Sequence, residues 1–222
     1  MKTLVAQPSL VDQVKAAIFE AILDGTLQPG ERLIQEQVAQ QLGVSRQPVQ
    51  QALVVMRDQG LVVDAPGRGL MVPPLDLSHV EHVYQIRAEL EGMACRQIAK
   101  HITSAQVKNG LLLIDKGRRA VEAGSVAKMI SADIAFHQFI YRCSGNPLID
   151  STMAPHLVYT QRVMGEVLMR DQEPRDIWGQ HEAIWLAVSN SDPSRAEALV
   201  EAHLLNACGY MLERLEHRKK TV

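Results

Sequence analysis

The C-terminal half of this 222-residue chain carries ionisable side chains at helix positions that should be apolar. Asp133 and His137 are four residues apart, so they share one helix face beside Phe136. His181 and His203 interrupt apolar stripes of two further segments. Buried polar groups need hydrogen bonds or a cation. Three imidazoles and one carboxylate from three helices predict a site for a divalent transition metal, with zinc expected first and nickel, manganese or iron as alternatives.

Each of these side chains also has an ordinary structural explanation. A single inward-facing histidine is more often a hydrogen-bonded core residue than a metal ligand, and only the set of four favours a metal. Such a site could activate water, so a metal-dependent hydrolase is an alternative function. The sequence offers no general base for it, because Glu182 directly follows His181 and points away from its face.

Arg87 is another charge in an apolar stripe, on the first helix of the same region. A guanidinium there needs a partner, which is either Glu91 one turn on or an anion in a pocket. Tyr159 and Asn206 could hydrogen-bond to a ligand or to the metal-binding residues, although ordinary packing is the simpler explanation for both. The sequence therefore predicts a polar pocket that includes Arg87.

The overall composition is that of an ordinary globular protein, with 46% hydrophobic and 22% charged residues. No apolar run reaches the roughly 20 residues of a membrane-spanning helix, and no secretory signal is present, so we expect a cytoplasmic protein without membrane contact. Three scattered cysteines exclude a disulfide framework. The first 75 residues carry six Lys/Arg against seven Asp/Glu, so bulk charge does not indicate nucleic-acid binding.

Pro73 and Pro74 divide the chain, because neither fits inside a helix. We expect one domain over residues 1–74 and a second over 75–222. In the second, helical periodicity is interrupted five times, at 101–104, 123–125, 144–147, 172–174 and 191–193. The predicted fold class is mainly α: a winged helix-turn-helix of three helices and a small β-hairpin, followed by a six-helix antiparallel bundle.

The expected first domain begins with a helical pattern over 11–22. A second helix over 34–42 ends at Gly43, and Ser45 is the N-cap of a third that ends near Gly60. Two apolar runs then flank the turn-rich segment 64–69, which predicts a hairpin or wing. Two short helices joined by a glycine turn form a helix-turn-helix.

The segments 22–25, 29–33, 42–49, 52–53, 60–62 and 67–69 together resemble the winged helix-turn-helix of GntR-family bacterial transcription regulators. The resemblance implies binding to double-stranded operator DNA, with the start of the third helix in the major groove and the wing near the minor groove. Gln50 departs from the family, which commonly has an arginine there, and this changes the expected half-site. The residues expected to contact DNA are Arg32, Ser45, Arg46, Gln47, Gln50, Arg68 and Gly69.

The order Asp133-x-x-x-His137, His181 and His203 is similar to the metal site of the FCD effector domain of the FadR subfamily. Six helices after a short linker favour its VanR-like branch. The resemblance implies a homodimeric regulator, a repressor and not an enzyme, that binds a small organic acid between Arg87 and the metal. Arg162 matches a position that is frequently basic in these domains. A direct sensor of the metal itself is the remaining alternative.

Overall fold

The computed structural model describes residues 8–168 and 176–221. The chain forms two compact units, Met1–Leu75 and Asp76–Val222. Within the described ranges, no helix combines the length and the apolar character that crossing a membrane requires. Each unit has its own buried apolar core, and each is described by itself below.

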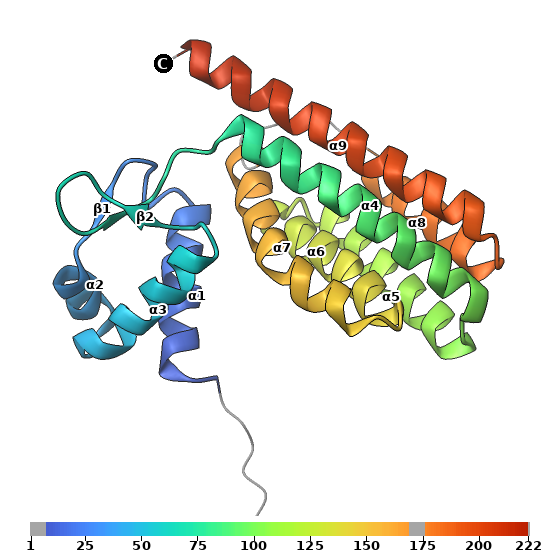
Figure 1. Cartoon of the computed structure of the whole chain (residues 1–222), viewed down its shortest axis with the longest axis horizontal. Helices are drawn as coiled ribbons and strands as arrows, with labels where there is room; N and C mark the ends of the chain where they lie inside the picture. The colour runs from blue at the N-terminus through green and yellow to red at the C-terminus, as the bar shows by residue number, and fades with distance from the viewer. Residues whose placement is uncertain (1–7, 169–175, 222) are drawn as a thin grey trace, which may run out of the picture. The chain divides into compact units, whose positions relative to one another are not determined.

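The first unit contains three helices and a small sheet (Figure 1). The helices are α1 (Leu10–Leu23), α2 (Gln35–Leu42) and α3 (Arg46–Asp58). Val14, Ile18 and Ile22 recur every four residues on α1, and all three are buried. Between α2 and α3, Gly43 adopts a φ of 65°, a left-handed conformation that ends α2 and allows the tight turn. The helix-turn-helix expected from the sequence is therefore present.

The wing is a three-stranded antiparallel sheet with the order β1-β3-β2. The predicted hairpin consists of β2 (Val63–Asp64) and β3 (Leu70–Met71). A third strand, β1 (Arg32–Leu33), pairs with β3 and was not predicted, because two residues are too few to display an alternating pattern. It ties the segment before α2 to the wing.

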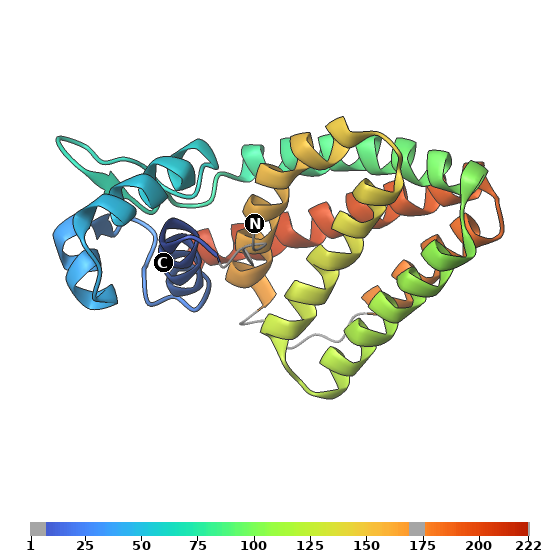
Figure 2. The same cartoon turned by 90° about the horizontal axis from the view of Figure 1, so that it is seen from below.

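The second unit is a bundle of six helices over the described residues, as the sequence predicted. Its long helices α4 and α9 lie side by side and antiparallel (Figures 1 and 2). The predicted break at 172–174 lies outside the described residues. The six helices are α4 (Leu77–His101), α5 (Ser104–Glu122), α6 (Val126–Cys143), α7 (Pro147–Leu168), α8 (Ile177–Ser189) and α9 (Pro193–Thr221).

Polar side chains fix where several of these helices begin. The side chain of Asp76 accepts a hydrogen bond from the backbone N–H of Ser78 at the start of α4. At the start of α5, Thr103 and Gln106 form a reciprocal capping box. Asp176 accepts from the backbone N–H of Gly179 and caps α8. These caps fix the residue at which each helix begins. The position of that residue then determines which later side chains face the core.

Two tryptophans of α8 pack on glycines of α5. A Cβ atom added to Gly110 would lie 2.0 Å from Cε2 of Trp185, and one added to Gly117 would lie 2.1 Å from Cζ2 of Trp178. Nε1 of Trp185 also donates a hydrogen bond to the backbone oxygen of Val107, at 3.1 Å. The close approach of α5 and α8 therefore depends on the missing side chains of these glycines.

We expect Gly110→Ala to destabilise the protein by about 1–3 kcal/mol, because the new methyl group overlaps a buried indole ring. The matched control is Gly209→Ala in α9, where a Cβ meets nothing within 4 Å among the described residues. That variant should be neutral or more stable by up to about 1 kcal/mol, from higher helix propensity. Urea unfolding measures both, and equal stabilities would contradict the packing described here.

Candidate metal centre and nucleic-acid interface

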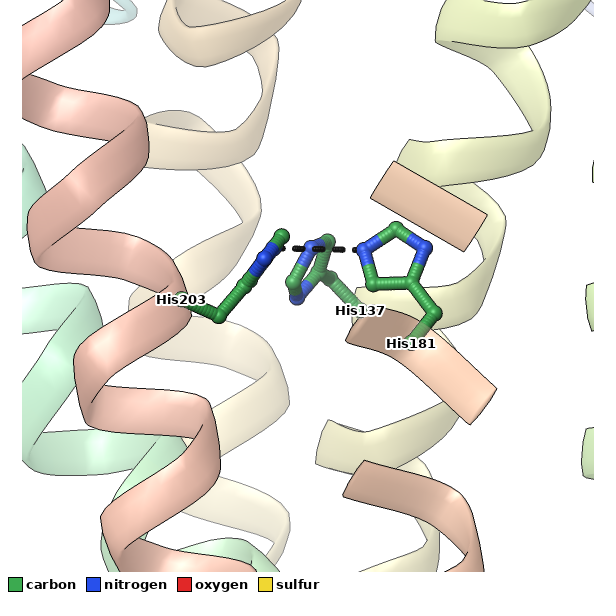
Figure 3. A group of neighbouring side chains, drawn as sticks. All are labelled: His137, His181 and His203. Carbon is green, nitrogen blue, oxygen red and sulfur yellow. Dashed lines mark hydrogen bonds between the residues drawn. The ribbon is translucent and has the colours of Figure 1, made fainter. Parts of the chain in front are cut away.

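Three histidines from three helices meet inside the second unit. His137 lies on α6, His181 on α8 and His203 on α9. All three are buried, and each offers one ring nitrogen such that these atoms all lie within 4.8 Å of one another. The Nε2 atoms of His181 and His203 face each other at 3.2 Å, and the ring of His137 lies beside them (Figure 3).

Asp133 adds a carboxylate to the cluster, one helical turn before His137. Its Oδ1 atom lies 3.4 Å from Nε2 of His181, and its Oδ2 atom lies 3.8 Å from Nε2 of His137. Burial raises the pKa of Asp133, and the nearby positive charge of Arg87 opposes this rise. The four residues predicted as ligands are therefore brought together.

Two of the imidazoles are held by partners on their outer side. His137 Nδ1 lies 2.5 Å from Oε2 of Glu91, and His203 Nδ1 lies 2.8 Å from Oε1 of Gln180. Both partners are oxygen acceptors, so both imidazoles donate from Nδ1, and in their neutral form Nε2 carries no proton. The bare Nε2 atoms then face the same small volume as the Asp133 carboxylate.

This donor set fits a divalent transition metal. Two ligand nitrogens on one tetrahedral zinc ion lie about 3.3 Å apart when each bond is about 2.0 Å. The 3.2 Å between His181 and His203 and the 3.4 Å between His181 and Asp133 agree with that spacing, whereas the 3.8 Å between His137 and Asp133 is longer. Nitrogen and carboxylate donors also suit nickel, iron and manganese, so the geometry selects a class of ion and not one element.

The electrostatics of His181 favour the neutral form that a metal ligand needs. Burial holds the pKa of His181 well below its usual value, and the neighbouring His203, His137 and Arg87 lower it further. Its ring stacks on Phe136 with centroids 4.5 Å apart. Nδ1 of His181 is buried and has no hydrogen-bond partner among the described residues. His181 is thus held by packing, whereas His137 and His203 are held by polar partners.

A buried ion pair adjoins the cluster. Arg87 and Glu91 lie one turn apart on α4, and Nε of Arg87 donates to Oε1 of Glu91 at 3.0 Å. The hydroxyl of Tyr141 donates to the same oxygen at 2.5 Å. Burial raises the pKa of Glu91, but the hydrogen bonds from His137 and Tyr141 and the charge of Arg87 outweigh it and hold the pKa at about 2. Of the two partners considered for Arg87, the structure contains Glu91.

The remaining predicted effector residues do not join this cluster. Tyr159 and Arg162 are buried on α7, and the ring of Tyr159 meets that of His79 edge-on at 4.6 Å. Asn206 is exposed. His203 lies at the edge of the buried stripe of α9, and a residue three positions on is rotated by about 60° further from that stripe. Contacts of these three residues with an effector stay predictions.

Sequence reasoning missed three roles that the structure makes plain. Glu91 was considered only as a partner of Arg87, whereas it also binds His137. Tyr141 and Gln180 were not singled out at all. Tyr141 lies four residues after His137, and this i, i+4 spacing was the available signal. Gln180 directly precedes His181 and gave no signal, because its contact with His203 depends on how α8 packs against α9.

In the first unit, the start of α3 presents a polar surface. Ser45, Arg46, Gln47 and Gln50 are exposed, while the opposite face of α3 is buried in the core. Ser45 occupies the N-cap position without a side-chain capping bond, so its hydroxyl is not used by the helix. Free N–H groups at a helix start attract phosphate. Arg46 forms an exposed ion pair with Glu36 of α2.

Arg32 and Arg68 are connected through the wing. The guanidinium of Arg32 donates to the backbone oxygens of Pro66, at 2.6 Å, and Arg68, at 3.3 Å. Gly67 and Gly69 flank Arg68 with φ values of 91° and 94°, which only glycine adopts without strain. Arg32 therefore holds the turn in place, and Arg68 projects from its exposed tip.

Comparison with known families assigns both units. Residues 82–206, more than half of the chain, match the family described as "FCD domain", and residues 10–72 match "Bacterial regulatory proteins, gntR family". The chain is a GntR-family regulator with an FCD domain. The resemblance stated from the sequence is therefore confirmed, and the protein is a DNA-binding transcriptional regulator.

Relatives of this GntR-family chain are regulators too. The transcriptional regulator McbR of Escherichia coli K12 is 30% identical over 141 residues, which are 64% of each chain, so the match spans less than two thirds of McbR. YdhC of Bacillus subtilis, an uncharacterized regulator, is 24% identical over 94% of this chain and 92% of its own. The solved structure of E. coli McbR/YncC superposes with a TM-score of 0.80 at 23% identity, over 93% of this chain and 99% of that one.

The buried position of His181 predicts a pH dependence for metal-free protein. The unfolded chain binds a proton at this residue below about pH 6.5 and the folded chain does not, so stability falls as the pH decreases. The slope contributed by one such proton is at most about 1.4 kcal/mol per pH unit. In urea unfolding between pH 7 and 5.5, His181→Gln should flatten the curve, while the exposed-site control His82→Gln should follow the wild type. A His181→Gln curve as steep as the wild type would contradict the lowered pKa.

Proposed function

We propose that this regulator is a homodimeric repressor whose affinity for operator DNA changes when a small carboxylate binds at a metal ion in the FCD domain. The observation that carries the proposal is the buried group of His137, His181, His203 and Asp133. The expectation of repression is supported by RspR of E. coli K12, named a transcriptional repressor, which is 25% identical over 86% of this chain.

The chemistry of the four donors supports a resident metal. Glu91 and Gln180 hold two imidazoles with Nε2 unprotonated, and a third acceptor, the carboxylate of Asp133, lies beside them. Lone pairs that face one another in an apolar interior are unfavourable unless a cation lies between them. A bound ion would supply that cation and leave positions open for an oxygen ligand.

Arg87 supports a carboxylate as the effector. Its Nε is occupied by Glu91, whereas its Nη2 is buried and has no hydrogen-bond partner among the described residues. A guanidinium donor left over in a buried site favours an anion that accepts from it. A carboxylate could bind the metal with one oxygen and Arg87 with the other. Arg162, Tyr159 and Asn206 remain candidate contacts for larger acids.

A dimer would supply two recognition helices for an inverted-repeat operator. Each copy would contribute Arg32, Arg46 and Arg68 together with Ser45, Gln47, Gln50 and Gly69. Allostery then requires that the acid and the operator favour different dimer geometries, with a coupling of about 1–3 kcal/mol. The exposed α3 surface and the tightly held wing support this assignment of the DNA-contacting residues.

We expect the protein to select a short palindrome from random duplexes, and Arg46→Ala to weaken that binding by about 1–3 kcal/mol. The matched control is Arg119→Ala in the FCD domain, where an equally exposed arginine pairs with Asp115. Gel shifts over a salt series measure both variants. If no duplex is selected at low salt, or if both variants lose affinity equally, the assignment of Arg46 fails.

A thermal-shift series tests the sensor. A panel of small carboxylic acids should raise the melting temperature only with zinc or cobalt bound, because a ligand of the folded state stabilises it by about 2.7 kcal/mol at 100 times its Kd. Asp133→Ala and His181→Ala should abolish the shift, while the exposed-site variant His82→Ala should keep it. A full shift in Asp133→Ala would refute the metal bridge.

The metal-loaded and metal-free proteins also distinguish the two alternative functions, a direct metal sensor and a metal-dependent hydrolase. If chelation alone releases DNA and no acid changes the affinity, the domain is a direct metal sensor. A hydrolase would need a base near the ion, but Glu182 is bound to Arg118 at 2.6 Å on the surface between α5 and α8. Turnover of ester or amide substrates by metal-loaded protein would nevertheless establish that activity.

A further inference from the structure

Glu91 lies at the centre of the polar interior of the FCD domain, where it is completely buried. Three donors from two helices converge on its carboxylate. Nε of Arg87 and the hydroxyl of Tyr141 bind Oε1, and Nδ1 of His137 binds Oε2. Both carboxylate oxygens therefore have partners. Oε1 accepts from Arg87 and Tyr141, and Oε2 accepts from His137.

The contact between Oε2 of Glu91 and His137 controls which ring nitrogen of His137 carries the proton. A carboxylate oxygen only accepts, so the Nδ1 of His137 must be the protonated nitrogen. In the neutral imidazole Nε2 is then a bare lone pair, and this atom lies 3.8 Å from Oδ2 of Asp133. If Nδ1 met a donor instead, the proton would have to move to Nε2, and His137 could not bind a metal through that atom.

We propose that Glu91 is a positioning residue that makes one metal ligand depend on the effector arginine, because its two oxygens hold Arg87 and the Nδ1 proton of His137 at the same time. The inference rests on the proposed metal site. It goes beyond that site by naming the group outside the ligand set that keeps His137 in its metal-binding tautomer and fixes the orientation of Arg87.

The isosteric variant Glu91→Gln separates this role from simple packing. Glutamine has a single acceptor oxygen, and the side with two donors, one of them charged, should attract that oxygen. The amide NH₂ would then face Nδ1 of His137. As a donor, it would force the imidazole to accept at Nδ1 and to carry its proton on Nε2. We expect the tautomer of His137 to change without any change in side-chain volume.

A second change should reverse the effect. In Arg87→Met/Glu91→Gln the charged donor is gone, so the amide can turn its oxygen toward His137, and its NH₂ can donate to the hydroxyl oxygen of Tyr141. The double variant also removes the unpaired buried charge that Glu91→Gln leaves behind, so we expect it to be more stable than the single variant. We expect it to regain the wild-type tautomer.

The experiment combines ¹⁵N NMR of the imidazole nitrogens in metal-free full-length protein with Zn²⁺ and Co²⁺ affinities from chelator competition. Wild type should show His137 protonated on Nδ1, and Glu91→Gln should show Nε2 protonation and 10–100-fold weaker metal binding. Arg87→Met/Glu91→Gln should recover both. One control should keep the wild-type values: Glu197→Gln, which breaks the Arg96–Glu197 pair between α4 and α9.

Nε2 protonation of His137 in the wild type would overturn the inference, and that measurement needs no variant. Unchanged metal affinity in a folded Glu91→Gln, or failure of the double variant to recover it, would overturn it as well. If the wild type instead shows the Nδ1 tautomer but binds neither ion, the proposed metal function fails and the positioning of His137 by Glu91 stands.

Discussion

The interior of the FCD domain is organised by one constraint, that a polar group removed from water is costly unless it finds a partner. Arg87 and Glu91 pair within α4, and Glu91 then binds His137 and Tyr141 of α6. The ring of His137 meets that of His181 of α8 edge-on, and Nε2 of His181 lies 3.2 Å from Nε2 of His203 of α9. Four helices therefore meet around groups that would each be unfavourable alone, so moving one helix disturbs partners on the others.

The sequence was sufficient to single out the four clustered residues, because each of them breaks a local rule. A histidine or aspartate in an apolar helical stripe is visible from spacing alone, and Asp133 with His137 shows it within a single turn. The hydrogen-bond partners of those residues break no such rule. Gln180 and Glu91 are ordinary residues of helix sequences, and only the packing of α8 on α9, and of α4 on α6, gives them imidazole partners.

Asn206 shows that helical spacing alone does not predict which residues are buried. Leu199, His203, Asn206 and Tyr210 have helical spacing, but the buried stripe of α9 runs along the other side of His203, through Val200 and Leu204. Spacing defines a face, and it does not say which edge of that face the neighbouring helices cover. In the first unit the same distinction applies to Arg32, whose partners Pro66 and Arg68 lie more than thirty residues away in sequence. Helices and turns were predictable there, whereas contacts between them were not.

The buried ion pair of Arg87 and Glu91 is better explained by function than by stability. An ion pair in an apolar interior is weak evidence for stability, since apolar side chains of similar volume often serve as well or better. Two apolar residues in place of Arg87 and Glu91 could fill the same space between α4 and α6. They could neither leave a guanidinium donor facing the interior nor hold His137 with its proton on Nδ1. Beyond packing, the pair orients polar groups. Arg87 places a cationic donor beside the cluster, and Glu91 holds the imidazole of His137 so that its Nε2 lone pair faces the cluster. A site must have donors and acceptors oriented in this way before a metal ion and a carboxylate anion can bind in it together.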